Sequence, residues 1–237
     1  MICMRTIMVY PMAQMPAVQF AAEELKRQGV QVVSSLTGDV THVLLGVPTK
    51  EADFSRIPPG VTVIGGNLDH IPDSFPKIDL LREEQYLAEN AAITADCALR
   101  LLGERLGVVF RGCPVLVIGW GRIGKCLAAM LKALDAEVTV AARKPADLGM
   151  LAALGYQAVA VDKIEPGAYR AIVNTAPAPV LAGGGEEACI KIDLASRLGI
   201  AGENVLWARG LPGKMLPETS GECIARGVMR HLREVNA

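Results

Sequence analysis

The chain has 237 residues, 51% of them hydrophobic, and a formal net charge of −1 at pH 7. This length suits one large domain or two modest ones, and the apolar content is enough to build buried cores. The balanced charge excludes the basic excess of nucleic-acid-binding proteins. No apolar run approaches the roughly 18 residues that a membrane span requires. We therefore expect a globular protein with neither nucleic-acid nor membrane partners.

Residues 1–10 alternate like a strand, without the charged start and cleavage site of a signal peptide. The six cysteines show no C-x-x-C spacing and no histidine at metal spacing. This pattern predicts buried thiols in a cytoplasmic protein and no metal site. The three histidines (His42, His70 and His231) lie far apart in sequence, which favours a structural role for each.

The first part of the chain alternates short apolar runs with one helical pattern. Strands are expected at residues 6–10, 30–33, 42–45 and 61–64, and a helix at about 17–28. Together these elements predict a small α/β domain over residues 1–89, on the substrate side of the protein. A Gly/Pro-rich stretch then leads to a long amphipathic helix over about 82–106, irregular near Asn90 and ended by Gly107. Its residues 90–107 are expected to bridge two domains.

Residues 115–124 carry the most informative motif, because an apolar run of strand length leads directly into Gly-Trp-Gly-Arg-Ile-Gly. In such a turn Gly119 permits the tight bend, Gly121 lets the backbone approach a pyrophosphate, and Gly124 lets the next helix pack close to the sheet. The pyrophosphate would lie at the positive end of that helix. Cofactor contacts are therefore predicted at Gly119, Trp120, Gly121, Arg122, Ile123 and Gly124.

The context of the motif fits a βαβ unit, with a helical stripe after Gly121 and a second strand at 138–142. An NAD site usually has a carboxylate about 20 residues past the glycines, for the ribose 2′-hydroxyl. That place reads Ala142-Arg143-Lys144, and two cations favour a 2′-phosphate. We therefore predict that Arg143 and Lys144 bind NADP(H) in preference to NAD(H). The alternatives are a glycine-rich turn without a ligand and two ordinary solvated charges.

The remaining apolar runs complete a second domain over residues 108–237. Strands are expected at 158–161, 171–174, 190–194 and 205–208, with a helix near 147–154. A Rossmann-type doubly wound parallel sheet in the order 3-2-1-4-5-6 is the natural assembly, with ligands outside the carboxyl ends of the strands. A closing helix over about 221–235 is placed to pack back towards the first domain.

Polar residues follow the later strands of this sheet. Asn174, Thr175, Ala176 and Pro177 end the fourth strand and Asp193 the fifth, and these five are predicted to contact the cofactor. Ser196 and Lys214 follow in the next two loops, where Ser196 would orient a substrate and Lys214 would bind a carboxylate or transfer a proton. The alternative is that Asn174 and Ser196 cap turns while Lys214 points to water.

Several blocks of sequence together resemble one known family. They are residues 90–96 (NAAITAD), 115–124 (VLVIGWGRIG), 142–143 (AR), 174–177 (NTAP), 192–196 (IDLAS) and 210–213 (GLPG), followed by Pro217, Thr219 and Gly221. In their order and spacing, over about residues 90–237, these blocks resemble the A subunit of dipicolinate synthase. The chain departs from the family pattern in its N-terminal domain, which is expected to be shortened.

The resemblance implies a sporulation enzyme, the pyridine-nucleotide dehydrogenase that works with a flavoprotein-like B subunit. Its reaction would oxidise a dihydrodipicolinate-derived precursor to dipicolinate, which is pyridine-2,6-dicarboxylate. The resemblance adds Thr94 to Ser196 and Lys214 as a candidate catalytic residue, with Arg122 and Thr219 as further candidate carboxylate anchors. Arg122 lies inside the glycine turn, which favours a role at the pyrophosphate or at the domain interface instead. A homo-oligomer is expected by analogy with related dehydrogenases.

Two other functions fit the same residues. An NADP-dependent reductase of another small carboxylate would keep the glycine motif and differ only in its N-terminal domain. A non-catalytic nucleotide-binding subunit or scaffold would bind the cofactor without transferring a hydride.

Overall fold

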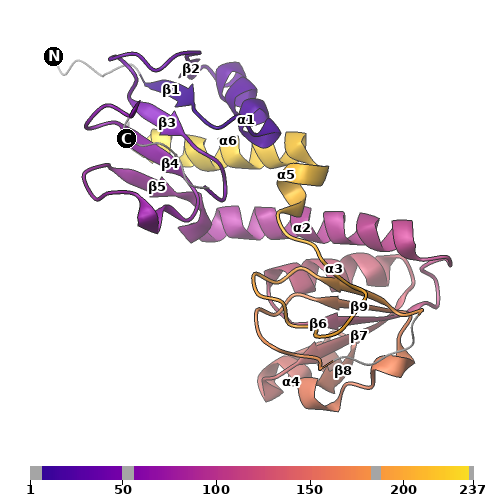
Figure 1. The fold of residues 1–237 in the computed structure, drawn as a ribbon. Helices are drawn as coiled ribbons and strands as arrows, with labels where there is room; N and C mark the ends of the chain where they lie inside the picture. The colour runs from indigo at the N-terminus through magenta and orange to yellow at the C-terminus, as the bar shows by residue number, and fades with distance from the viewer. Residues whose placement is uncertain (1–6, 50–55, 183–187, 235–237) are drawn as a thin grey trace. The chain divides into compact units, whose positions relative to one another are not determined.

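The structure is a computed structural model that describes residues 7–49, 56–182 and 188–234 (Figure 1). The chain divides into two compact units. The first unit comprises Met1–Asn90 and Pro212–Ala237, and the second comprises Ala91–Leu211. Each unit is built on a parallel sheet.

The sheet of the first unit has five strands in the order β2-β1-β3-β4-β5. Their bounds are β1 Met8–Pro11, β2 Gln31–Val32, β3 His42–Leu44, β4 Thr62–Gly65 and β5 Lys77–Asp79. Four of these strands lie where the sequence predicts them, although residue 6 of the first prediction lies outside the described residues. The fifth, β5, is not predicted, because Lys77-Ile78-Asp79 offers one apolar residue and no alternating run.

Two helices lie side by side in the first unit, α1 (Pro16–Arg27) and α6 (Pro217–Glu234) (Figure 1). They approach closely at Gly221, where a Cβ would lie 2.5 Å from the Cβ of Phe20 and 2.7 Å from the carbonyl oxygen of Ala17. The closing helix therefore belongs to the first unit. This corrects the expected boundary, which assigned all of residues 108–237 to the Rossmann domain.

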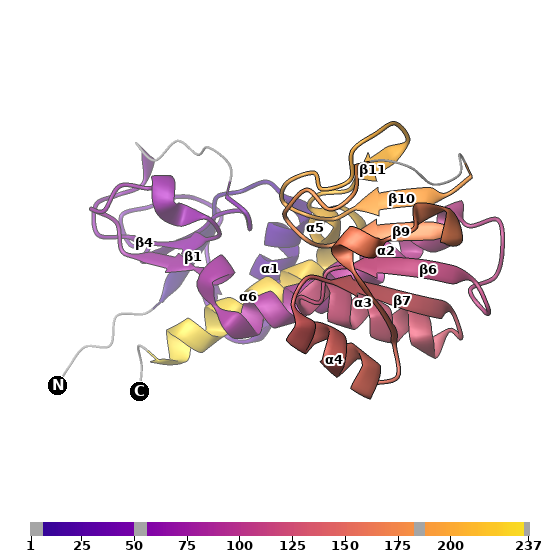
Figure 2. The ribbon, with the colours of Figure 1, turned by 90° about the horizontal axis from the view of Figure 1, so that it is seen from below.

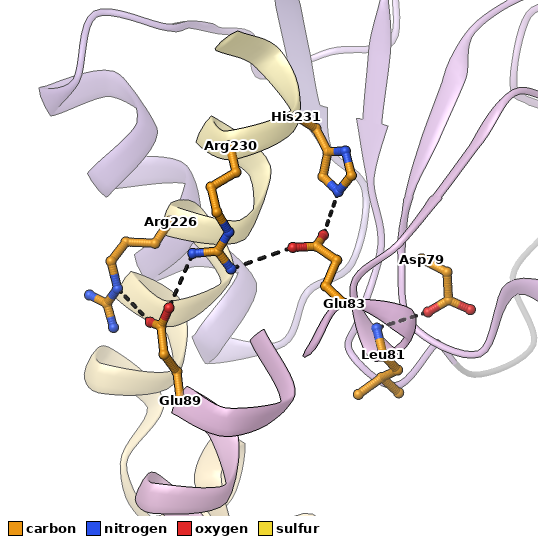
Figure 3. Close-up of polar contacts among 7 residues, drawn as sticks. All are labelled: Asp79, Leu81, Glu83, Glu89, Arg226, Arg230 and His231. Carbon is orange, nitrogen blue, oxygen red and sulfur yellow. Dashed lines mark hydrogen bonds and ion pairs between the residues drawn. The ribbon is translucent and has the colours of Figure 1, made fainter. Parts of the chain in front are cut away.

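Charged side chains join α6 to the segment at the start of α2 (Glu84–Arg105), within the first unit (Figure 3). Glu89 accepts from Arg226 Nε at 2.8 Å and from Arg230 at 3.1 Å, while Glu83 meets His231 Nε2 at 2.5 Å. Burial alone would raise the pKa of Glu89, but the hydrogen bonds and charges of Arg226 and Arg230 hold that pKa below its ordinary value. Glu89 is therefore stabilised as a carboxylate.

The second unit has a six-stranded parallel sheet in the order β11-β10-β9-β6-β7-β8 (Figure 2). Its strands are β6 Pro114–Ile118, β7 Glu137–Ala142, β8 Gln157–Ala160, β9 Ala171–Asn174, β10 Ile190–Asp193 and β11 Val205–Trp207. Counted along the chain, this is the predicted 3-2-1-4-5-6 order, so the Rossmann-type doubly wound sheet is confirmed. Residues 115–118 of β6 and 171–173 of β9 have no exposed surface, as expected for central parallel strands.

The helices of the second unit include α3 (Arg122–Ala133), which follows β6, and α4 (Pro145–Ala153), which follows β7. The long helix α2 runs without a break through Asn90, so the irregularity expected there is absent. A short helix α5 (Leu211–Met215) and four 3-10 turns complete the described elements. None of the helices in residues 7–49, 56–182 and 188–234 is both long and apolar enough to cross a membrane.

Candidate functional site

A cavity of about 300 Å³ opens at the carboxyl edge of the second unit's sheet. It lies at the ends of β6, β7 and β9, where the strand order reverses and ligands of doubly wound sheets bind. Eight of the predicted cofactor residues line it: Gly119, Trp120, Gly121, Arg143, Lys144, Thr175, Ala176 and Pro177. The sequence motif and the cavity therefore coincide.

The glycine turn between β6 and α3 is shaped by close contacts. Gly119 has a φ of +104°, and a Cβ there would lie 2.6 Å from the hydroxyl oxygen of Thr175. At Gly124, in the first turns of α3, a Cβ would lie only 2.1 Å from the carbonyl oxygen of Gly119. Since unbonded heavy atoms do not approach so closely, both positions require glycine. The helix can therefore begin directly beneath the end of the strand.

Gly121 plays a different part in the turn. It precedes the first residue of α3, its backbone is extended, and a Cβ placed on it would meet no atom within 4 Å. The open space above it is part of the cavity. Because glycine has no side chain, no side-chain hydrogen bond caps α3 here, and the positive end of the helix dipole lies beside the cavity.

The other residues of the motif have separate surroundings. The Trp120 ring packs edge-on to Tyr156, with 5.6 Å between ring centroids, and the ammonium of Lys125 lies 5.7 Å from its centre. Arg122 is exposed and Ile123 half-buried at the start of α3. Neither Arg122 nor Ile123 is among the residues that line the cavity.

Arg143 and Lys144 are exposed at the end of β7 and line the cavity, as the predicted 2′-phosphate contact requires. Sequence reasoning missed a carboxylate nearby. Asp147, in the first turn of α4, lines the same cavity. The sequence could have indicated Asp147, because it stands four residues after Arg143 and begins a predicted helix.

Asn174 and Asp193, both predicted to contact the cofactor, are fully buried instead. Asn174 Nδ2 donates to Asp193 at 3.0 Å and to the carbonyl of Ala176 at 3.1 Å, and its Oδ1 accepts the N–H of Ala176 at 2.9 Å. Neither side chain lines the cavity. Their hydrogen bonds hold the loops after β9 and β10 from the buried side of the sheet edge.

The Asp193 carboxylate is the centre of this arrangement. Besides Asn174, it accepts the backbone N–H groups of Ala195, Gly199 and Ile200 at 2.7–3.0 Å. Such a carboxylate, surrounded by donors and excluded from water, holds a loop in one conformation.

The three predicted catalytic residues do not line the cavity. Ser196 is exposed in the loop after β10, at the same edge of the sheet. Thr94 is buried in α2. Lys214 is exposed in α5 and belongs to the first unit.

Two buried cysteines of the second unit, Cys97 and Cys113, are held as thiols at neutral pH. Burial raises the pKa of Cys97 to about 11 and also raises that of Cys113. Among the five cysteines in the described residues, Cys126 alone is not buried. The prediction of buried thiols is confirmed for the other four of these five.

No protein-family model matches the chain. The chain is 27% identical over 174 residues to the A subunit of dipicolinate synthase from Bacillus subtilis (strain 168), a match that covers 68% of this chain and 59% of that relative. A solved structure of dipicolinate synthase, A chain, from Bacillus subtilis superposes with a TM-score of 0.81 at 18% identity, and the match covers 98% of this chain and 97% of that one. The resemblance predicted from the sequence is confirmed.

Two further solved structures share the fold. The A subunit of dipicolinate synthase from Bacillus halodurans has a TM-score of 0.80 at 20% identity, over 95% of this chain and 97% of that one. A transhydrogenase from Sinorhizobium meliloti has a TM-score of 0.73 at 12% identity, over 96% and 94%. The chain thus has an oxidoreductase-type fold and resembles the A subunits of dipicolinate synthases in both sequence and structure.

Proposed function

We propose that this protein is an NADP-dependent oxidoreductase that oxidises a dihydrodipicolinate-derived ring to dipicolinate, with the role in sporulation that the resemblance implies. The observation that carries the proposal is the cavity at the β6–α3 turn, which combines a glycine cradle with two cations. The likeness to the A subunit of dipicolinate synthase supports the choice of substrate. On the same resemblance we propose a homo-oligomeric state and a flavoprotein-like B subunit.

The residues present fit a dinucleotide. The α3 N-terminus beside Gly121 suits a pyrophosphate, because no side chain caps it and the positive end of the helix dipole lies there. Arg143 and Lys144 suit a 2′-phosphate, which a guanidinium binds through two parallel hydrogen bonds. Thr175 holds the turn, since its hydroxyl donates to the carbonyl of Ile118 at 3.0 Å.

The proposed reaction removes a hydride and a proton from a partly saturated ring. When bound, the oxidised nicotinamide supplies the hydride acceptor, and the proton leaves to water or to a protein base. The chain itself positions the substrate ring and excludes other substrates. Ser196 is the predicted catalytic residue best placed for this, because it is exposed at the carboxyl edge of the sheet. Thr94 and Lys214 stay predictions.

The test is a titration of the purified protein with NADPH and NADH, followed by nucleotide fluorescence, with an Arg143→Ala variant beside the wild type. We expect NADPH to bind at least tenfold more tightly than NADH, because one guanidinium–phosphate pair contributes about 1.5–3 kcal/mol. The variant should lose that preference and keep its NADH affinity.

Arg170→Ala is the matched control, since Arg170 is also exposed but precedes β9 at the opposite edge of the sheet. It should leave both affinities unchanged. Equal affinities for the two nucleotides in the wild type would overturn the NADP assignment. No binding of either at millimolar concentration would overturn the oxidoreductase proposal itself.

A further inference from the structure

Trp207 is an exposed aromatic residue at the carboxyl edge of the second unit's sheet. It ends β11, where it pairs with Asp193, the last residue of β10. The residue is 46% exposed, although an indole ring gains much from burial. Ligands of open parallel sheets collect at this edge, so an exposed ring here is a candidate ligand contact.

The indole ring is held in a fixed orientation. Its Nε1–H donates to the carbonyl oxygen of Ala195 at 2.9 Å. The Ala195 loop is itself fixed, because the buried carboxylate of Asp193 accepts the N–H groups of Ala195 and Gly199. Since the one polar group of the indole is used within the protein, its exposed aromatic surface is what it offers a ligand.

A cation lies at the ring, and a serine follows in the loop that holds it. The guanidinium carbon of Arg209 lies 5.5 Å from the centre of the Trp207 ring, and the side chain is exposed. Ser196, also exposed, directly follows Ala195. A guanidinium pairs with a carboxylate through two hydrogen bonds, and an aromatic surface suits a planar partner.

We propose that Trp207 and Arg209 form a substrate subsite for a planar ring carboxylate. The substrate ring contacts the indole, and its carboxylate binds the Arg209 guanidinium beside the Ser196 hydroxyl. Arg209 and Trp207 thereby determine which rings the enzyme accepts.

This inference rests on the proposed function, because that function decides which end of the cofactor faces the subsite. Arg143 and Lys144 mark the 2′-phosphate end at β7, so a dinucleotide that crosses the sheet between β6 and β9 directs its nicotinamide towards β9 and β10. At ordinary strand spacing β11 is about 10 Å from β9. A substrate at Trp207 therefore lies on the nicotinamide side.

The experiment measures binding of pyridine-2,6-dicarboxylate by calorimetry and by tryptophan fluorescence, with glutarate as a dicarboxylate without a ring. The chain has two tryptophans, and Trp120 lines the nucleotide cavity. Trp207 should therefore report the ring ligand, and Trp120 the nucleotide. We expect the ring dicarboxylate to bind at least fivefold more tightly than glutarate and to quench the wild-type emission.

Two variants test the subsite against a matched control. Trp207→Phe should abolish the quenching and weaken ring binding at least fivefold, and Arg209→Gln should weaken it at least tenfold. Arg170→Gln, at the opposite sheet edge, should leave it unchanged. NADPH affinity should stay within twofold of the wild type in all three.

Unchanged ring affinity in both subsite variants would overturn the proposal, as would equal affinity for glutarate or a wild type that binds NADPH but not the ring. Failure of NADPH binding is a separate result. It would refute the proposed function, while the subsite would still be judged by the ring dicarboxylate alone.

Discussion

The sheet of each unit begins with a parallel strand followed by a turn and a helix, but the two turns differ in structure. In the second unit the turn from β6 to α3 is rich in glycine and opens into a cavity. In the first unit the turn from β1 to α1 reads Met12-Ala13-Gln14-Met15. There the sulfur of Met15 lies 2.7 Å from where a Cβ on Gly46 would be, so a side chain fills the place next to the strand end.

The difference shows that a parallel sheet does not by itself make a cavity at its carboxyl edge. Both sheets bring the carboxyl ends of their strands to one edge. The second unit alone combines, at its first turn, a helix beginning beneath the strand with a residue that has no side chain above it. The site therefore depends on a few contacts in the turn and on the loops that face it.

The largest loss of stability is expected at Asp193, which holds the loops after β9 and β10. Asp193→Ala removes the acceptor of four buried donors, and we expect it to lower the free energy of unfolding of the second unit by about 4 kcal/mol. Urea denaturation followed by far-UV circular dichroism measures this loss. Arg197→Ala changes an exposed residue of the same loop and should alter stability by less than about 0.5 kcal/mol. Equal effects of the two variants would contradict the role assigned to Asp193.

Two glycine substitutions test the two units one at a time. Gly124→Ala forces a methyl group against the Gly119 carbonyl, and Gly221→Ala forces one between α6 and α1. Each should lower the free energy of unfolding by about 2–3 kcal/mol, the upper part of the usual range of about 1–3 kcal/mol for overpacking. Gly124→Ala alone should also weaken NADPH binding at least tenfold. Loss of NADPH binding in folded Gly221→Ala protein would show that the turn is not the local determinant of the site.

The smallest effect is expected in the ion cluster of the first unit. Because the folded-state pKa of Glu89 is depressed below 4.5, its stabilising effect is complete above about pH 5 and is lost as the pH falls through the folded pKa. Glu89→Gln should therefore cost about 1 kcal/mol at pH 7 and much less at pH 3.5. Urea denaturation at both pH values tests this. Glu23→Gln, in an exposed pair with Lys26, is the control and should show little change at either pH.

The sequence was sufficient for the sheet of the second unit and for the glycine turn between β6 and α3. Its central strands, β6 and β9, are almost entirely apolar, as expected for a sheet covered on both faces, and Gly124 and Gly119 lie where contacts of 2.1 and 2.6 Å exclude a side chain. Arg143 and Lys144 were found because a strand end fixes where the next residues lie. Local pattern determines these features, so they are predictable from one chain.

The rest depends on contacts between distant segments. Asp193 follows a strand like any loop carboxylate, and its sequence does not reveal that Gly199 and Ile200 turn back to donate to it. Similarly, the sequence placed the closing helix α6 towards the first domain, but only the packing at Gly221 identifies α1 as its partner. The continuity of α2 through Asn90 follows from strong helix formers on both sides, which outweigh the small penalty of one asparagine.

The membership of α6 in the first unit has a consequence for synthesis. The chain forms α1 early in the first unit, but its partner helix α6 begins only at Pro217. At the ordinary rate of translation, roughly 10–40 s separate the two helices. During that interval the second unit is fully synthesised, while the apolar face of α1, including Ala17 and Ala21, waits for its partner. A nascent chain stalled before residue 217 would therefore combine a complete Rossmann sheet with an open first unit, the form that a chaperone or a protease would recognise.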